Sequence, residues 1–394
     1  MPSKVVIVGE NETLIWALNS SQRIKRQIQA CGMVASVSDD DFAEAEQTLV
    51  LNSNYVFETL TIEGFAARPD TVLRADDGGI AAIRCTGMFV EQGLEAMRGN
   101  RALPEHLKTI RAQELAGYNS RLRKTQPPLL ETVRADNADA LESLLYGNSY
   151  KGVTDLVTKW WWPRPARVIT GWCARSGITP NQVTLTGFAL VIAAYFLFGA
   201  GQYAAGLMCG WIMTLLDTVD GKLARVTVNS SKLGHVLDHG LDMIHPPFWY
   251  AAWGMSVLGT GGWLGFTTMD GCWLVVLGYI GGRFIEASFH SLGACGMFAW
   301  RPFDAWFRLV TARRNPCLII LTTLLIVTGP TAAFWGVVVW TVLSTFIMLL
   351  RLMYATFVRL RSGPLDSWLK DSARAAREHP RSYAEFSGTR GAFR

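Results

Sequence analysis

The feature that most constrains how this chain of 394 residues can fold is a change of composition near its middle. Residues 1 to about 150 carry mixed charge and ordinary apolar content, whereas from Asn181 onward long runs are rich in Leu, Ile, Val, Phe, Trp and Gly. An apolar helix needs about 20 residues to cross a bilayer. The composition therefore predicts a cytosolic domain followed by a membrane-embedded domain.

Six apolar runs in the second half approach the length of a membrane-spanning helix. They lie at residues 181–200, 203–221, 236–259, 271–292, 316–329 and 332–358. The second and third carry acidic residues, and the fifth is short enough to need extension into the loop before it. We therefore expect an α-helical membrane domain of about six transmembrane helices at residues 179–361.

The connections between these runs alternate between basic and non-basic. Those after the second, fourth and sixth runs contain Lys and Arg, whereas those near 200–203, 259–271 and 329–333 contain neither. Because Lys and Arg accumulate on the cytoplasmic side, this alternation places both termini in the cytoplasm. It disfavours a soluble all-helical protein, and no signal peptide is visible. We expect an integral membrane protein, in the inner membrane if the source is bacterial.

The net charge of +5 is modest and spread along the chain. A basic bias can indicate nucleic acid or cytoplasmic loops that face anionic lipid. Since the later Lys and Arg residues sit between apolar runs, we expect the lipid bilayer as a partner and no nucleic acid. Seven cysteines are scattered without a C-x-x-C pair, which argues against a zinc site or a disulfide framework.

Residues 149–178 contain the run Trp160-Trp161-Trp162 among several basic residues. Trp and basic residues together are typical of a segment lying along lipid headgroups. We expect an interfacial amphipathic segment here; the alternative is a Trp-rich packing surface for the N-terminal domain.

Four aspartates follow within residues 217–242. On a helix, residues three or four apart share a face, so Asp217 and Asp220 line one stripe of the second run. Asp238 and Asp242 do the same at the start of the third run. Four carboxylates near a membrane boundary repel one another and are costly to desolvate, unless they face a polar cavity and share cations. Oxygen ligands suit Mg²⁺ or Mn²⁺.

The residues between these aspartates fit phosphate transfer. Small side chains at Gly221, Ala224 and Gly234 leave room for a ligand close to the helices. Arg225 offers a fixed positive fork to a phosphate, and Ser231 could donate to a phosphate oxygen. Two metals would neutralise a diphosphate, and one remaining carboxylate could take the proton of an attacking hydroxyl. The alternative, a set of helix caps and loop acids paired with nearby Lys and Arg, is disfavoured by four acids at two helical spacings.

The pattern D-x2-D-G-x2-A-R-x8-G-x3-D-x3-D, from Asp217 to Asp242, resembles the CDP-alcohol phosphatidyltransferase signature at all eight fixed positions. The resemblance covers roughly 150–361, including I-T-P-N-Q-V-T at 178–184. It implies six transmembrane helices around a cytoplasm-facing polar cavity, usually in a homodimer.

The same resemblance implies roles for individual residues. Asp217, Asp220, Asp238 and Asp242 would bind two divalent ions, Mg²⁺ or Mn²⁺, and Asp242 would be the general base. Residues assigned to the CDP-alcohol are Asn181, Thr184, Asp217, Gly221, Ala224, Arg225, Ser231 and Gly234. The acceptor hydroxyl would attack the β-phosphorus, and CMP would leave.

The signature leaves the two alcohols open. Family members join CDP-diacylglycerol to small polyols or their phosphates, or CDP-headgroups to lipid or soluble acceptors; we expect the first. Related enzymes hold acceptor phosphates with basic residues of the later helices, which implies Arg283, Arg313 and Arg314 here. Arg283 could instead pair with Glu286, and the other two could serve as positive-inside anchors. A cation transporter and an inactive scaffold are the alternatives from other functional classes.

Residues 1–148 alternate strand-like and helix-like segments, which is typical of an α/β domain. Expected strands lie at 5–8, 33–37 and 48–51, expected helices at 20–30 and 39–47, and a hairpin turn at 76–79. This order resembles a nucleotidyltransferase domain of the kind fused to some phosphatidyltransferases that make their own CDP-alcohol.

Two departures from that pattern predict a degenerate domain. The segment after the first strand, residues 9–13, has two glutamates and one glycine where active relatives have a basic, Gly-rich loop. Asn52 and Asn54 stand where a metal-binding Asp would follow the third strand. Glutamates repel a nucleotide's phosphates. We expect a role in assembly, regulation or acceptor handling, with active cytidylyltransfer as the alternative.

The end of the chain, residues 362–394, is polar, with Arg-rich patches and scattered aromatics. We expect a tail that is flexible or lies on the anionic leaflet.

Overall fold

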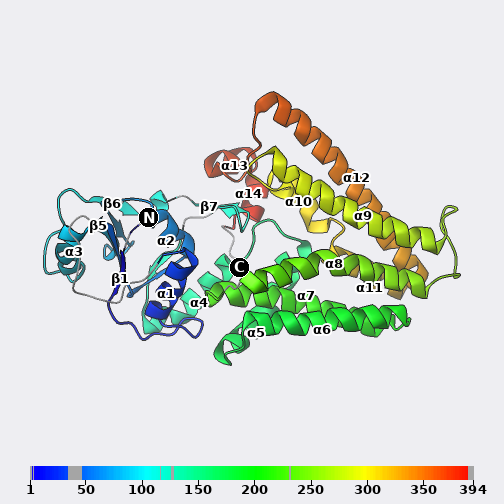
Figure 1. The fold of residues 1–394 in the computed structure, drawn as a ribbon, viewed down its shortest axis with the longest axis horizontal. Coiled ribbons are helices and arrows are strands. Elements are labelled where there is room, and N and C mark those ends of the chain that lie inside the picture. Colours follow the sequence, from blue (N-terminus) through cyan, green and yellow to red (C-terminus); the bar gives the residue numbers. More distant parts are fainter. Residues whose placement is uncertain are drawn as a thin grey trace.

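A computed structural model of the chain describes residues 2, 4–33, 47–115, 117–125, 128–229 and 232–388, apart from the side chains of 232–239, 241 and 242. An α/β domain, which contains the chain's first strand, lies beside a bundle of long helices, and the chain's last helices lie on the side of the bundle that faces this domain (Figure 1).

The N-terminal domain is built on a mixed sheet of five strands in the order β1-β2-β5-β4-β6. The strands are β1 (Lys4–Val8), β2 (Gln47–Asn52), β4 (Thr71–Arg74), β5 (Ile80–Thr86) and β6 (Lys108–Arg111). Because successive residues of a strand face opposite sides, Val5 and Leu49 pack beneath α1 (Ser20–Ala30) and α2 (Thr59–Ala66), whereas Val6 and Val50 pack against α3 (Val90–Met97).

Most of the expected α/β elements are confirmed. The strands at 5–8 and 48–51, the helix at 20–30 and the hairpin turn at 76–79 are all present. In the turn, Gly78 has a φ of 85° and its N–H donates to the carbonyl of Ala75. The expected strand at 33–37 and helix at 39–47 lie outside the described residues, except that Met33 is in no strand and Gln47 begins β2.

The domain is completed by smaller elements that lead to the helical part. Strand β3 (Tyr55–Phe57) pairs with β9 (Leu130–Thr132), and β7 (Tyr118–Asn119) pairs with β8 (Lys124–Thr125). Helix α4 (Ala138–Asn148) then runs to the end of the helical bundle.

All six apolar runs form helices in the second half of the chain. They are α6 (Pro180–Gly199), α7 (Tyr203–Val226), α8 (Lys232–Ser256), α9 (Thr268–Phe289), α11 (Arg314–Val327) and α12 (Pro330–Ser362). Within the described residues, α6, α9 with its extension to Leu292, and α12 are long and apolar enough to cross a membrane. A fourth candidate is α10 (Pro302–Val310) followed by α11, a pair bent by 45°. The helical part thus holds three or four candidate spans, and the count of six stays a prediction.

The helices are apolar on their outer faces as well as between one another. Large exposed side chains include Leu185 and Phe196 on α6, Phe284 on α9, Ile326 on α11 and Leu360 on α12. Helices that are apolar all round are typical of a membrane domain. The interior is filled by bulky aromatics, among them Trp249, Trp253 and Phe334.

The Trp-rich segment forms a π-helical turn at Val157–Trp161 and then α5 (Pro163–Arg175). Trp160 and Trp161 are about half exposed. The rings of Trp161 and Trp162 each lie 6.0 Å from the ring of Trp211 on α7. The segment therefore packs against the helical bundle, and it also contacts the N-terminal domain, where the hydroxyl of Tyr146 on α4 donates to the carbonyl of Pro163 over 3.3 Å. Its place among the headgroups stays a prediction.

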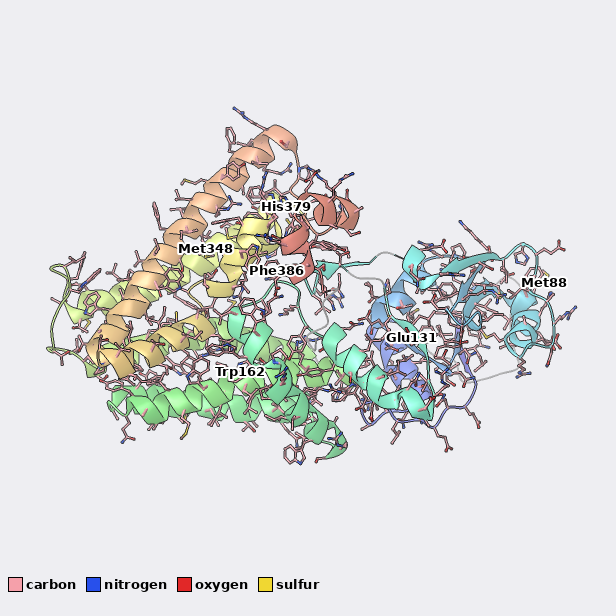
Figure 2. All side chains as sticks on the ribbon, turned by 180° about the vertical axis from the view of Figure 1, so that it is seen from behind. Met88, Glu131, Trp162, Met348, His379 and Phe386 are labelled. Carbon is pink, nitrogen blue, oxygen red and sulfur yellow. The ribbon has the colours of Figure 1, made fainter. Side chains whose placement is uncertain are left out.

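Of the two alternatives for the tail, flexibility is wrong for residues 362–388, whereas a place on the anionic leaflet stays a prediction. Helices α13 (Ser372–Glu378) and α14 (Pro380–Phe386) fold back, and Leu369 and Phe386 are completely buried with Phe289 and Phe298 (Figure 2). The N–H of Thr125 on β8 donates to the carbonyl of Ser387 over 3.0 Å. The few apolar residues of this polar segment are therefore the ones that anchor it.

Replacing Phe386 with Ala should lower the free energy of unfolding by about 3 kcal/mol or more, because a buried ring is removed from a packed cluster. Thermal unfolding in detergent measures this as a lower midpoint. The exposed neighbour Arg381, changed to Ala, is the matched control. Equal midpoints for the two variants would contradict the packed tail.

Candidate functional site

The first two bundle helices bring Thr184 and Asp220 together. Helix α6 begins with a capping box between Thr179 and Gln182 and has Pro180 in its first turn, so Thr184 lies one turn inside the helix. The hydroxyl of Thr184 donates to Oδ2 of Asp220 over 2.6 Å. Asp220 is only 5% exposed, and a buried carboxylate needs such donors.

The second aspartate of α7 faces a different helix. Nη2 of Arg314, the first residue of α11, lies 2.6 Å from Oδ2 of Asp217. Both side chains are largely buried, and a charge-assisted hydrogen bond of this length is among the strong ones. The structure thus places an arginine expected at the acceptor directly on an aspartate expected at the metal.

Gly221 and Arg225 lie one above the other on α7. A side chain at position 221 would meet the Arg225 guanidinium, because a Cβ there would lie 3.0 Å from its Nη2. The space that glycine leaves is therefore occupied by the group expected to bind the donor's phosphates. Arg225 is exposed, Ala224 is partly exposed, and Asn181 is exposed on the first turn of α6.

The rest of the motif lies on α8 or just before it. Ser231 is outside the described residues, and Gly234, Asp238 and Asp242 lie on the α8 backbone without described side chains. Among the side chains that the structure does describe, no three of His, Cys, Asp or Glu gather into a metal-binding set. Asp217 and Asp220 supply carboxylate oxygens only, a donor set whose chemistry fits a hard divalent cation.

The remaining arginines expected at the acceptor share one carboxylate. Nη1 of Arg283 lies 2.9 Å from Oε2 of Glu286, and Arg313 forms an ion pair with the same oxygen. Pairing of Arg283 with Glu286 is therefore confirmed. Arg314 reaches the motif helix α7 through its ion pair with Asp217.

Two further arginines, Arg308 and Arg123, belong to this region and were not predicted from the sequence. The guanidinium groups of Arg308 and Arg313 lie 5.6 Å and 5.7 Å from the centre of the Phe298 ring. Burial lowers the pKa of Arg123, at the β7–β8 turn, while the charge of Glu286 raises it. No local pattern signals that Arg123 belongs with residues so much later in the chain. Together these groups form a positively charged cluster with Glu286 inside it.

A buried lysine of the motif was also missed. Lys222 is 2% exposed, its Nζ lies 3.3 Å from the centre of the Tyr150 ring, and it donates to the carbonyl of Ser149 over 3.2 Å. The cation–π contact and the hydrogen bond favour the charged amine, whereas burial and the nearby charge of Arg225 lower the pKa of Lys222. Lys222 thus joins α7 to the segment that follows α4.

Comparison with known proteins decides the family of the helical part. Residues 177–369 match the family model described as CDP-alcohol phosphatidyltransferase. These residues belong to the CDP-alcohol phosphatidyltransferase family. The matched region begins just before α6 and ends after α12, so the α/β domain and α5 lie outside it.

Several relatives share part of this domain. The archaetidylinositol phosphate synthase of Pyrococcus horikoshii is 40% identical over 72 residues, which is 18% of this chain and 38% of the relative. The phosphatidylinositol phosphate synthase of Mycobacteroides abscessus is 36% identical over 87 residues, 20% of this chain and 40% of the relative. That of Mycolicibacterium smegmatis is 33% identical over 108 residues, 26% of this chain and 49% of the relative. The chain therefore spans less than half the length of these curated relatives.

Replacing Thr184 with Val should destabilise the phosphatidyltransferase domain by about 1–3 kcal/mol, because Asp220 loses a hydroxyl donor inside the bundle. Thermal unfolding in detergent reads this out, and Thr184→Ser should keep the midpoint. Thr186→Val is the matched control, since that hydroxyl is exposed and donates to the carbonyl of Gln182 within α6. If both valine variants unfold alike, the bond to Asp220 contributes nothing.

Proposed function

We propose that the chain transfers a phosphoalcohol group from a CDP-alcohol, most simply CDP-diacylglycerol, to the hydroxyl of a polyol phosphate and releases CMP. The observation that carries this is the placement of Asp217 and Asp220 against Arg314 and Thr184 inside a CDP-alcohol phosphatidyltransferase domain. The relatives named above, an archaetidylinositol phosphate synthase and two phosphatidylinositol phosphate synthases, support a phosphorylated polyol as acceptor.

The donor would lie along the cytoplasmic ends of α6 and α7. The exposed Arg225 fork can pair with the diphosphate, and Asn181 and Thr184 border it from α6. Asp217 and Asp220 would hold divalent ions together with Asp238 and Asp242. Mg²⁺ or Mn²⁺ bound there would neutralise charge on the diphosphate.

The transfer itself needs one proton acceptor and an oriented hydroxyl. The acceptor oxygen forms a bond to the β-phosphorus, the bond from that phosphorus to the bridging oxygen breaks, and the electron pair leaves with CMP. Asp242 takes the hydroxyl proton as general base. We further propose a homodimer in the membrane with both termini in the cytoplasm.

The arginine cluster favours a phosphorylated acceptor over a neutral polyol. Arg283 and Arg313 share the carboxylate of Glu286, and Arg308 lies near Asp155. With Arg123 beside them, the described side chains of the cluster carry more positive than negative charge, which a phosphate can match. A neutral polyol would leave that charge uncompensated. A soluble or headgroup CDP-alcohol with a lipid acceptor is the second candidate, because the motif does not define the alcohol of the donor.

A cation transporter is the weaker alternative. Transport requires polar groups across the full depth of the membrane. On α7 the acids lie in the last three turns, and the helix before them is apolar apart from Thr214.

The proposal is tested with purified protein, Mg²⁺ or Mn²⁺, CDP-diacylglycerol and a panel of polyols and polyol phosphates, with CMP release as the readout. We expect CMP only when a polyol phosphate is present. The panel is repeated with CDP-headgroup donors and lipid acceptors, and transfer in that arm alone would select the second candidate. Absence of CMP in every arm would overturn the enzyme proposal.

Asp242→Asn should reduce turnover by about a thousandfold, because the amide cannot accept the hydroxyl proton. Binding of CDP, measured by calorimetry, should change by less than about threefold, since three aspartates remain. The exposed Asp366→Asn is the matched control and should keep full turnover. Normal turnover of Asp242→Asn would show that the base is another group.

Arg283→Gln should raise KM for the phosphorylated acceptor by about 10- to 100-fold, the effect of losing one charged hydrogen bond. KM for the CDP-alcohol should stay within about twofold, because Arg283 lies on α9 and not on the motif helices. Arg361→Gln, at the exposed end of α12, is the control. An equal rise in KM for both substrates would contradict an acceptor role for the cluster.

A further inference from the structure

The C-terminal end of α7 is held by two arginines of the N-terminal domain. Nη2 of Arg23, on α1, donates to the carbonyl of Val226 over 2.7 Å and to that of Ile15 over 3.1 Å. Nη1 of Arg26 donates to the carbonyl of Thr227 over 2.8 Å. Positive charge is favourable at a helix C-terminus, where the carbonyls carry partial negative charge.

Arg23 completes the hydrogen bonding of the helix end. A helix leaves its last four carbonyls without partners inside the helix. Backbone N–H groups of the following turn satisfy the first three, in the bonds Thr227 to Leu223, Asn229 to Ala224, and Val228 to Arg225. The fourth carbonyl is that of Val226, and its partner is Arg23. The cap is therefore finished by a residue some two hundred positions earlier in the chain.

The turn after α7 is strained. Val228 has a φ of 47° at the position where helix caps of this hydrogen-bond pattern usually have glycine. A β-branched residue with positive φ is a clear outlier. The local sequence thus disfavours this turn, so contacts from outside must stabilise it.

An apolar contact reinforces the same junction. The side chain of Val226 is 1% exposed and lies in a cluster with Ile15, Trp16, Tyr146 and Tyr150. Apart from Val226, this cluster comes from the N-terminal domain and the segment that follows it. Figure 1 shows α1 and α4 of that domain at this end of the green helices.

We propose that Arg23 and Arg26 are positioning residues, through which the N-terminal domain holds the end of α7 and so orients Asp217 and Asp220 for phosphoryl transfer. Asp220 lies less than two turns before Val226 on the same helix. The turn at Val228 also leads toward α8, which carries Asp238 and Asp242. The expected effect on kcat rests on the proposed transferase activity. The expected effect on the end of α7 rests on the hydrogen bonds alone.

Arg23 keeps its charge at neutral pH. Burial lowers its pKa to about 10, with a further lowering by the charge of Arg26 and an opposing effect of Glu142. The guanidinium therefore stays a donor to the α7 carbonyls. These hydrogen bonds give the N-terminal domain a role in assembly that does not require it to bind phosphate.

The kinetic test compares Arg23→Gln with the unaltered protein. Because small displacements of reacting groups are costly, kcat should fall about 10- to 100-fold. KM for the acceptor should change by less than about threefold, since the arginine cluster lies on other helices. Lys25→Gln, an exposed cation on the same helix, should leave both constants unchanged.

A second substitution separates positioning from general loss of stability. Glycine adopts positive φ without strain, so Val228→Gly should recover at least about a third of the lost kcat in the Arg23→Gln background. Arg26→Gln, at a half-buried site, should show a smaller fall in kcat than Arg23→Gln. It replaces Arg23→Gln in the test if that variant does not fold. Unchanged kcat in both arginine variants overturns the proposal.

Hydrogen exchange tests the contact between Arg23 and the end of α7 without an activity assay. Amides of residues 223–229 should exchange about fivefold faster or more in Arg23→Gln, while those of β1 and β2 keep their rates. Unchanged exchange at 223–229 would overturn the proposal that Arg23 holds the end of α7, whether or not transfer of the phosphoalcohol is seen. If the unaltered protein transfers no phosphoalcohol, the proposed function is contradicted. Faster exchange in Arg23→Gln would then still support the role of Arg23 in holding the end of α7.

Discussion

Two carboxylates on one helix of an apolar bundle must be compensated, and the arrangement of the bundle follows from how this is done. Asp220 accepts a hydrogen bond from Thr184 of α6, and Asp217 forms an ion pair with Arg314 of α11. Removing one partner of such a pair leaves a buried charge without compensation, which is strongly destabilising. The two aspartates thus join α7 to its neighbour α6 and to α11, whose Arg314 follows Asp217 by 97 residues in the chain. The same oxygens are the ones that the proposed reaction needs for its cations.

The N-terminal domain and the phosphatidyltransferase domain are not independent units. Val226 is inserted into a cluster of the former, Lys222 lies on the ring of Tyr150, and Arg23 caps the motif helix. The chain's last helices return to the same junction, where Thr125 binds Ser387. In our proposal the N-terminal domain contributes to catalysis by holding α7, the helix that carries Asp217 and Asp220.

Features of local spacing could be predicted from the sequence, whereas distant pairings could not. Apolar runs predicted the helices, and the repeat of aspartates predicted that Asp217 and Asp220 share α7, since both follow from helical periodicity. Nothing local indicates that Arg314 meets Asp217 or that Arg23 reaches Val226. The tail was misjudged because its composition is polar, although single residues such as Phe386 are enough to anchor it.

The most direct measurement is anomalous diffraction from crystals grown with Mn²⁺ and CDP. We predict manganese bound to the carboxylates of Asp217 and Asp220, with the diphosphate of CDP beside Arg225 and the ends of α6 and α7. Manganese and CDP bound elsewhere, with the ion pair of Arg314 and Asp217 unchanged, would contradict it.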